Sequence, residues 1–286
     1  RTTHLHSAVL STASHRCLVT GGSGFLGRFI VEQLLERGHS VVVFDRVQGF
    51  SDRRVEFVVG DLTSSEDVDA AFARVDTVFH VASVVSSGSN ESVVRSVNVE
   101  GTKNVIAACL KHNVSQLIYT STASVAFDGT DTVYADELTP LPPTCMDSYA
   151  DSKRQAEQLV LAANGKGSLL TCSIRPHAIY GPRDPQFFPA LLQNARRRFF
   201  AQIGDGRNIS DFTYVENAAY AHLLAMEKLV PGSAVAGKEF FVTNGEPTGY
   251  ERGGVVHCGV VHWMVLWCIG WYCDALDGIV VHWMVL

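Results

Sequence analysis

Short apolar runs rich in β-branched residues alternate with amphipathic segments over residues 16–122. Runs of the first kind are typical of buried strands, and the spacing of apolar positions in the second kind indicates helices. The alternation predicts five strands, at residues 16–20, 40–44, 55–60, 77–81 and 116–121. It predicts three helices between them, at residues 25–37, 65–73 and 92–112. Strands joined by crossover helices pair in parallel, so βαβ units are expected here.

The same pattern continues with a helix expected at residues 148–164 and strands at 169–174 and 239–243. Seven strands in this order predict an α/β fold, a Rossmann-type doubly wound parallel sheet of about seven strands. We expect residues 16–175 to form the nucleotide-binding domain, including a catalytic helix. Residues 176–249 are expected to form a small C-terminal substrate-binding cap, interleaved with the last strand of the sheet.

The two ends of the chain differ from the rest in composition. Residues 1–15 are polar, and we expect a disordered leader or the end of a fragment. Residues 250–286 are apolar and contain one heptapeptide twice, at 260–266 and 280–286. Positions 255–273 carry no charge over a length that suits a membrane span, although two histidines and two glycines weaken that interpretation. The abrupt change favours a tail that is not the native continuation, and membrane association stays open.

Composition and charge narrow the classes of partner. With 286 residues and 47% hydrophobic content, the chain can bury one sizeable core. Its formal net charge is -6, and lysines and arginines are scattered except at 196–198, which argues against a nucleic-acid partner. The seven cysteines show no Cys-x-x-Cys or Cys/His metal spacing. We therefore expect no metal site and no disulfide framework, and a reducing compartment.

A glycine cluster lies between the first expected strand and the first expected helix, in the segment Thr20–Gly27. Glycines in such a turn permit a positive φ, let the backbone approach a pyrophosphate and allow the helix to pack closely on its strand. The free N–H groups at the helix N-terminus then face the phosphates. This segment predicts a dinucleotide site whose contacts are Gly21, Gly24, Phe25, Leu26 and Gly27.

Acidic and apolar residues at the ends of the next strands extend this expected site. Asp45 follows Gly27 by eighteen residues and can accept hydrogen bonds from both adenine-ribose hydroxyls while repelling a 2′-phosphate, which favours NAD over NADP. The adjacent Arg46 could instead serve a phosphate. After the third strand, Asp61 and Leu62 are expected near the adenine, or Asp61 caps a helix. After the fourth, the backbone around Ala82 is expected to line the ribose, or His80 simply packs at a strand end.

Tyr149 and Lys153 form the chain's one Tyr-x-x-x-Lys pair, and on a helix they project from the same face. A phenol is a poor base at neutral pH, but a neighbouring ammonium and an oxidised nicotinamide both favour the phenolate. A tyrosine tuned in this way can take the proton of a substrate hydroxyl during hydride transfer. A second hydroxyl should hold the substrate oxygen. The end of the fifth strand offers Thr122, which we favour, and then Ser124 and Ser121.

These residues together resemble the extended short-chain dehydrogenase/reductase family. The general marks are Thr20-Gly-Gly-Ser-Gly-Phe-Leu-Gly27, Asp45, Asp61-Leu62, Asn98-Val-Glu-Gly-Thr102 and the Tyr149/Lys153 pair. The 3β-hydroxysteroid dehydrogenase branch is indicated by three further segments, at 119–129, 175–184 and 204–217. Within that branch the sequence is most similar to the decarboxylating sterol-4α-carboxylate 3-dehydrogenases, over about residues 16–249.

The resemblance implies NAD-dependent oxidation of a sterol or steroid 3β-hydroxyl, with decarboxylation of a 4α-carboxysterol. It assigns Lys153 a second role, binding the nicotinamide ribose, and places Pro176 and Ile179 against the nicotinamide. The family usually has serine where this chain has Thr122. The resemblance also implies an endoplasmic reticulum membrane or its cytoplasmic face, a possible homodimer and no nucleic-acid partner.

Three alternatives remain open from the sequence. One is an NADPH-dependent reductase of a flavonoid or cinnamoyl-type ketone, which Asp45 and the segment 175–184 disfavour. Another is a sugar-nucleotide epimerase, for which no nucleotide-sugar clamp is evident. The third is a catalytically silent NAD-binding protein, which the intact Tyr149 and Lys153 disfavour and the unusual tail favours.

Overall fold

The computed structural model describes residues 14–249 apart from 86–89, 131–134, 187–188 and 190–208. Within this part the predicted seven-stranded parallel sheet is confirmed, with the strand order β10-β6-β5-β4-β1-β2-β3. The strands are β1 (Arg16–Thr20), β2 (Ser40–Asp45), β3 (Val55–Val59), β4 (Thr77–His80), β5 (Gln116–Thr120), β6 (Leu170–Pro176) and β10 (Glu239–Val242). The order reverses next to β1, so the crevice between β1 and β4 opens at the carboxyl ends of the strands.

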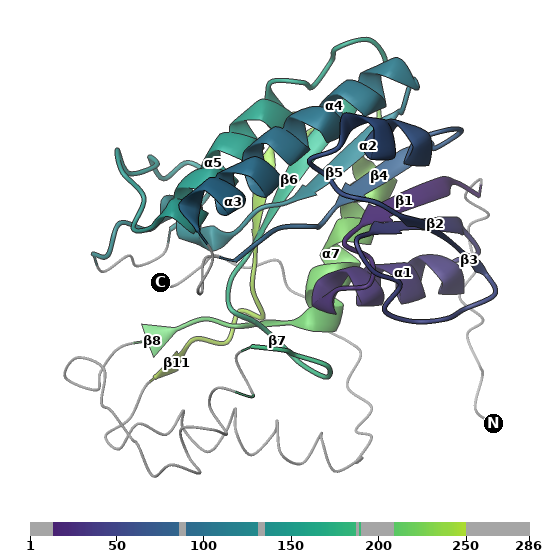
Figure 1. Ribbon diagram of the computed structural model, residues 1–286. Helices are drawn as coiled ribbons and strands as arrows, with labels where there is room; N and C mark the ends of the chain where they lie inside the picture. Colours follow the sequence, from purple (N-terminus) through teal and green to yellow (C-terminus); the bar gives the residue numbers. More distant parts are fainter. Residues whose placement is uncertain (1–13, 86–89, 131–134, 187–188, 190–208, 250–286) are drawn as a thin grey trace, which may run out of the picture.

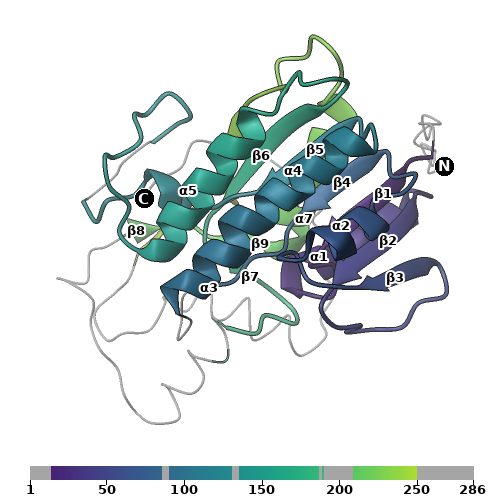
Figure 2. The same ribbon diagram turned by 45° about the horizontal axis from the view of Figure 1, so that its top comes forward.

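Helices cover both faces of the sheet (Figure 1). One face carries α1 (Phe25–Glu36) and α7 (Val215–Lys228), which share an apolar cluster with β1 and β2. The other face carries α2 (Ser65–Ala71), α3 (Glu91–Arg95), α4 (Gly101–Lys111) and α5 (Ser148–Leu161) (Figure 2). A second apolar cluster joins this layer to the sheet. The central strands β1, β4 and β5 are therefore buried on both sides, whereas the edge strand β3 stays partly exposed.

The helix predicted at 92–112 is three consecutive elements, which corrects the sequence prediction. Between α3 and α4 lies a single π-helical turn, η1 (Ser96–Glu100). A π-turn inserts one residue into the helical register. Here it directs the amide of Asn98 inward, where the side chain is 2% exposed and bonded on every polar atom. The 3.6-residue apolar period continues on either side of the turn, so the pattern alone did not reveal it.

The region beyond Pro176 contains more than the expected cap. Two short pairs of strands lie there, β7 (Ile179–Tyr180) with β9 (Thr213–Tyr214), and β8 (Ile209–Ser210) with β11 (Thr248–Gly249). Helix α7, which the sequence analysis does not predict, packs directly on the sheet next to α1. Its first residues follow β9 without a break, so one segment contributes both to the region above the strand ends and to the sheet core.

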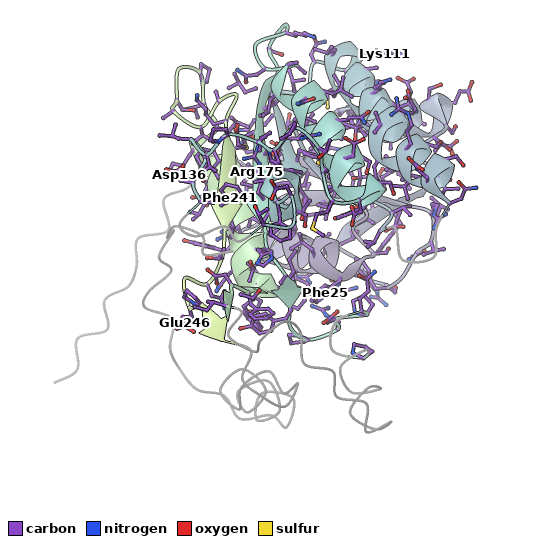
Figure 3. All side chains as sticks on the ribbon, turned by 90° about the vertical axis from the view of Figure 1, so that its left-hand side faces the viewer. Phe25, Lys111, Asp136, Arg175, Phe241 and Glu246 are labelled. Atoms are coloured by element: carbon purple, nitrogen blue, oxygen red, sulfur yellow. The ribbon has the colours of Figure 1, made fainter. Side chains whose placement is uncertain are left out.

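A buried ion pair fixes α5 on the sheet. Arg175 of β6 donates to Glu157 of α5 at 2.6 Å, and both side chains are 2% exposed. Ser173 donates a further hydrogen bond to the same carboxylate at 2.8 Å. Figure 3 shows Arg175 beside Phe241, whose ring centroid lies 5.1 Å from the guanidinium carbon. Because every charge in this cluster has a partner, the helix has one well-defined position.

None of the described helices is long and apolar enough to cross a membrane. The uncharged segment 255–273 and the repeated heptapeptide lie outside the described residues. Among the described residues no cluster of three or more His, Cys, Asp or Glu side chains has the arrangement of a metal site. Cys17, Cys109 and Cys172 are free and buried.

Candidate active site

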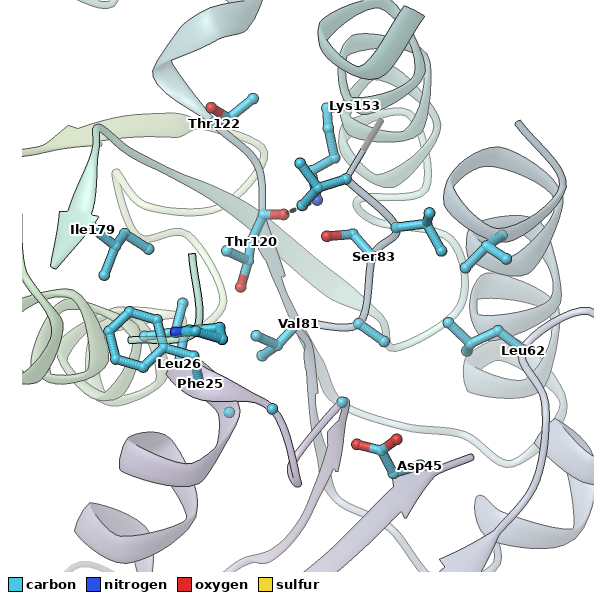
Figure 4. A pocket seen from close by; sticks show the side chains of 18 of the residues that line it. Phe25, Leu26, Asp45, Leu62, Val81, Ser83, Thr120, Thr122, Lys153 and Ile179 are labelled. Carbon is cyan, nitrogen blue, oxygen red and sulfur yellow. Dashed lines mark hydrogen bonds between the residues drawn. The ribbon is translucent and has the colours of Figure 1, made fainter. Parts of the chain in front are cut away.

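A cavity of about 580 Å³ lies at the carboxyl ends of the central strands (Figure 4). The residues favoured from the sequence for cofactor binding and catalysis all line it, whereas the alternative hydroxyl candidate Ser124 does not. They are Gly21, Gly24, Phe25, Leu26, Gly27, Asp45, Asp61, Leu62, Ala82, Thr122, Tyr149, Lys153, Pro176 and Ile179. The structure thus brings together side chains that are separated by up to 158 residues, because the strand ends of a parallel sheet meet at one edge.

The glycine-rich turn is shaped by close backbone contacts. Gly21 has φ of +69°, a conformation that residues with a Cβ rarely adopt. A Cβ on Gly21 would also lie 2.8 Å from the Cα of Ala82. A Cβ on Gly27 would overlap the carbonyl group of Gly21. These two glycines are therefore required for the turn to form at this distance from β4.

The N-terminus of α1 opens toward the cavity. Gly24 precedes the helix, and no side chain caps its first turn. Gly24, Phe25 and Leu26 line the cavity beside it. The first N–H groups of a helix have no partner inside the helix, and the helix dipole adds positive potential. A glycine-rich turn and an uncapped helix end form a cradle that fits a pyrophosphate.

Asp45, the last residue of β2, is held by backbone amides next to this turn. Its Oδ2 accepts from the N–H of Ser23 at 3.0 Å, and its Oδ1 accepts from the N–H of Arg46 at 2.7 Å. Each carboxylate oxygen can accept more than one hydrogen bond, so both retain acceptor capacity toward the cavity. The position and orientation of this carboxylate fit the predicted contact with ribose hydroxyls.

Asp61 lines the cavity but does not cap a helix, which corrects one of the two sequence interpretations. Its Oδ1 accepts from the backbone N–H and the hydroxyl of Thr63, each at 2.8 Å. These bonds lower the pKa of Asp61. The N-cap of α2 is Ser64, whose hydroxyl accepts from the N–H of Asp67 at 3.2 Å. Asp61 is consequently a charged side chain at the rim of the cavity.

The N-cap of α5 sets the phase of the Tyr149/Lys153 pair. Asp147 accepts from the N–H of Ala150 at 2.7 Å, so the helix begins one residue before Tyr149. Lys153, 1% exposed, donates from Nζ to the carbonyl oxygen of Thr120 at 2.5 Å (Figure 4). Burial lowers the pKa of Lys153 to about 7, against a smaller opposing effect of the Glu157 carboxylate.

The protein's own groups raise the pKa of Tyr149, whereas the sequence led us to expect that Lys153 and an oxidised nicotinamide together lower it. Burial, together with the charge of Asp147, raises this pKa to about 12, while an interaction with the Ser83 hydroxyl lowers it by a smaller amount. The ammonium of Lys153 is engaged by Thr120 instead. The protein's own groups therefore keep the phenol protonated. Ser83 lines the same cavity, and the sequence analysis missed it because a serine after a strand carries no distinctive pattern.

The hydroxyl groups after β5 take separate roles. Thr122 accepts from the N–H of Ser124 and begins the 3₁₀ turn η2 (Ala123–Ala126), and it lines the cavity. Ser121 also lines the cavity, whereas Ser124 is not among the lining residues. The strand ends at Thr120, so the alternation that grouped Thr122 with Ser124 does not continue through this turn.

Asn98 connects the two sides of the cavity. Its Oδ1 accepts from the N–H of Val84 at 2.8 Å, and its Nδ2 donates to the carbonyl oxygen of Val84 at 3.0 Å. Nδ2 also donates to the hydroxyl of Ser152 at 2.9 Å. Ser152 in turn donates to the carbonyl oxygen of Tyr149 at 2.7 Å. The segment after β4 and the helix of Tyr149 are therefore tied together through one buried amide.

Comparisons with known proteins agree with this geometry. Residues 18–253 match the 3-beta hydroxysteroid dehydrogenase/isomerase family. The sterol-4-alpha-carboxylate 3-dehydrogenase, decarboxylating, of Mus musculus is 46% identical over 247 residues, which cover 86% of this chain and 68% of that protein. The protein of the same name from Homo sapiens is 47% identical over 234 residues, which cover 81% and 63%. This chain thus spans only 63–68% of the length of these two relatives.

Among solved structures, the UDP-glucose 4-epimerase of Thermus thermophilus in complex with NAD has a TM-score of 0.70 to this chain. The two sequences are 28% identical, and the match covers 83% of this chain and 80% of that one. The fold is therefore shared with a structure that holds NAD.

Proposed function

Because the chain belongs to the 3-beta hydroxysteroid dehydrogenase/isomerase family, we propose that it is an NAD-dependent oxidoreductase acting on the 3β-hydroxyl of a sterol or steroid. The substrate we favour is a 4α-carboxysterol, in keeping with the names of its curated relatives. One observation carries the proposal. A single cavity joins a cradle for a pyrophosphate to the side chains Thr122, Tyr149 and Lys153.

The cavity supports the choice of NAD. Gly21, Gly24 and the first turn of α1 would hold the pyrophosphate, because the two glycines leave their backbone accessible and no side chain caps the helix. Asp45 would bind the adenine ribose and disfavour a 2′-phosphate. Asp61, Leu62 and Ala82 would lie around the adenosine, and Pro176 and Ile179 around the nicotinamide. Lys153 would bind the nicotinamide ribose. When bound, oxidised NAD accepts the hydride that leaves C3 of the substrate.

Tyr149 is the proposed base for the C3 hydroxyl. Its phenol is buried and has a raised pKa, so it must lose its own proton before it can act as a base, and that loss requires positive charge near the phenol oxygen. Protonated Lys153, one helical turn away, and the positively charged ring of bound oxidised NAD would supply such a charge together. Thr122 is the proposed donor to the substrate oxygen, which it holds while the carbonyl group forms. The proton passes from the C3 oxygen to Tyr149 as the C3–H bond breaks.

Loss of carbon dioxide needs no further residue. Oxidation at C3 places a ketone β to the C4 carboxylate, and such a β-keto acid can lose carbon dioxide by forming an enolate. The same hydroxyl donors that hold the C3 oxygen would stabilise the negative charge that develops on it. The enolate then takes up one proton at C4, equal in number to the proton released from the C3 hydroxyl, to give the 3-ketone.

A cofactor and substrate assay tests the proposal. Purified protein is supplied with NAD⁺ or NADP⁺ and with 4α-carboxysterols or a panel of 3β-hydroxysteroids, and reduced cofactor and carbon dioxide are measured. We expect NADH and carbon dioxide in equal amounts with the carboxysterols, and a loss of about 10² to 10⁴ in rate for Tyr149→Phe. The proposal fails if the protein binds NAD but oxidises no 3β-hydroxy sterol. Activity with NADPH and a planar ketone would favour the reductase alternative.

Location at the endoplasmic reticulum membrane or its cytoplasmic face, membrane association and a homodimer stay predictions from the family resemblance. Fractionation of cells that express the tagged chain, and sedimentation of the purified protein, are the measurements that decide them.

A further inference from the structure

His222 on α7 is a fully buried titratable side chain that the mechanism above does not use. Its Nδ1 lies 2.7 Å from the carbonyl oxygen of Ala218, and its Nε2 lies 2.7 Å from the hydroxyl of Thr120. Burial lowers the pKa of His222 to about 4, so the ring is neutral at neutral pH. A carbonyl oxygen only accepts, and the single ring proton is therefore on Nδ1. Nε2 must then accept the hydroxyl proton of Thr120.

Thr120 faces two ways from the end of β5. Its hydroxyl donates to His222 on one face of the sheet. Its carbonyl oxygen accepts from Nζ of Lys153 at 2.5 Å on the other (Figure 4). All three side chains are buried and come from three different elements, α7, β5 and α5. Two hydrogen bonds, joined through the covalent frame of Thr120, therefore link the histidine to the lysine of the catalytic pair.

We propose that His222 is a positioning residue that, as a neutral acceptor, holds Thr120 in place and thereby fixes the carbonyl oxygen to which Lys153 is bound. The effect of His222 on turnover rests on the proposed function, whereas the two hydrogen bonds of Thr120 are independent of it. Because the Thr120 hydroxyl is committed to His222, it is unavailable to the substrate, which leaves Ser121 and Thr122 as the hydroxyl groups of this segment that line the cavity.

The surroundings of Lys153 explain why one acceptor matters. Glu157, one turn further along α5, is the only carboxylate that acts on the ammonium among the described residues, and it is engaged by Arg175. The ring centroid of Tyr119 on β5 lies 4.5 Å from Nζ. His80 on β4 and His222 on α7 both feel the charge of Lys153 and stay neutral. The Thr120 carbonyl is therefore the main hydrogen-bond acceptor for the charged form.

Two nearly isosteric changes and one conservative change test the proposal. Thr120→Val removes the hydroxyl, His222→Leu removes the acceptor, and His222→Gln keeps an acceptor at the end of the side chain. We expect Thr120→Val and His222→Leu each to lower kcat about tenfold while the KM for the sterol changes less than about twofold. The double variant should be no slower than either single variant, and His222→Gln should recover most of the rate. Effects that multiply, or a glutamine variant as slow as the leucine variant, overturn the proposal.

Two NMR measurements on the wild-type protein and the same variants do not depend on turnover. The ¹⁵N shifts of His222 should show that Nδ1 carries the ring proton and that Nε2 carries none. In Thr120→Val the shift of Nε2 should change, because the hydroxyl that donates to it is removed. The pKa of Lys153 should fall by at least about half a unit in Thr120→Val and His222→Leu, because the charged form loses a fixed acceptor. A protonated Nε2, or an unchanged pKa of Lys153, overturns the proposal. If these shifts occur while no sterol is oxidised, the proposed function fails and the positioning role stands.

Discussion

Replacement of Lys153 by methionine should make the protein more stable, and by an amount that depends on pH. Methionine keeps most of the apolar stem and removes the ammonium. The pKa of Lys153 is about 7 in the folded chain, against an ordinary value of 10.5. Between these two values the unfolded chain binds more protons than the folded one, so the free energy of unfolding rises with pH. From the two pKa values, the buried lysine costs about 4 kcal/mol of stability near neutral pH and about 2 kcal/mol two pH units higher.

Removal of the lysine also leaves the Thr120 carbonyl without its donor, which costs about 1 to 3 kcal/mol at every pH. We therefore expect Lys153→Met to be about 1 to 3 kcal/mol more stable near neutral pH, and that advantage to shrink by about 2 kcal/mol at the higher pH. Urea unfolding of both proteins at the two pH values gives this double difference. Lys103→Met, at an exposed lysine paired with Glu100, is the matched control, and its stability difference from the wild type should not change with pH. If the stability difference of Lys153→Met does not change with pH, the pKa of Lys153 is not lowered in the folded protein and the reasoning is wrong.

Three further changes have defined outcomes. Asp45→Ser should raise the KM for NAD about tenfold or more and reduce the preference for NAD over NADP, because one charged acceptor for the ribose is lost. Steady-state kinetics with both cofactors measure this preference. An unchanged ratio of kcat/KM for NAD to kcat/KM for NADP would show that Asp45 has no such role. Gly27→Ala should abolish NAD binding and lower stability by about 1 to 3 kcal/mol, because its Cβ meets the Gly21 carbonyl; calorimetric titration that finds normal affinity contradicts this. Glu157→Gln should cost about 3 to 5 kcal/mol by leaving Arg175 buried without its carboxylate, and a melting temperature equal to that of the wild type would show that Glu239, at 3.5 Å, replaces it.

The parts of the site that depend on strand ends were predictable from the sequence. Apolar runs define the strands, a parallel sheet brings their carboxyl ends together, and so Asp45, Ala82 and Thr122 had to lie near the glycine-rich turn. Tyr149 and Lys153 followed from helical spacing. The direction of the pKa shift of Tyr149 was not predictable, because the extent of burial is a property of the packed structure.

Two other features escaped for different reasons. The π-turn around Asn98 leaves the apolar period intact, so its only signal is a polar residue on an otherwise buried stripe. Helix α7 did carry a signal, since its buried positions follow helical spacing from Val215 through Ala218, Ala219, His222 and Leu223 to Met226. Because residues 176–249 were expected to form a cap, this helix was not predicted. Without this helix, the contact between His222 and Thr120 of β5 could not be predicted either.

The bonds between α7 and β5 also set the order in which the site can be completed. At the start of the strand, Gln116 donates to the carbonyl oxygens of Met226 and Leu229, the latter 113 residues later in the chain. At a translation rate of about 5 to 20 residues per second, the end of α7 is synthesised on the order of ten seconds after β5. During that interval the dinucleotide half of the fold can assemble from contiguous βαβ units, whereas the catalytic strand keeps one face uncovered. A nascent chain should accordingly acquire nucleotide affinity before it acquires a fixed catalytic lysine.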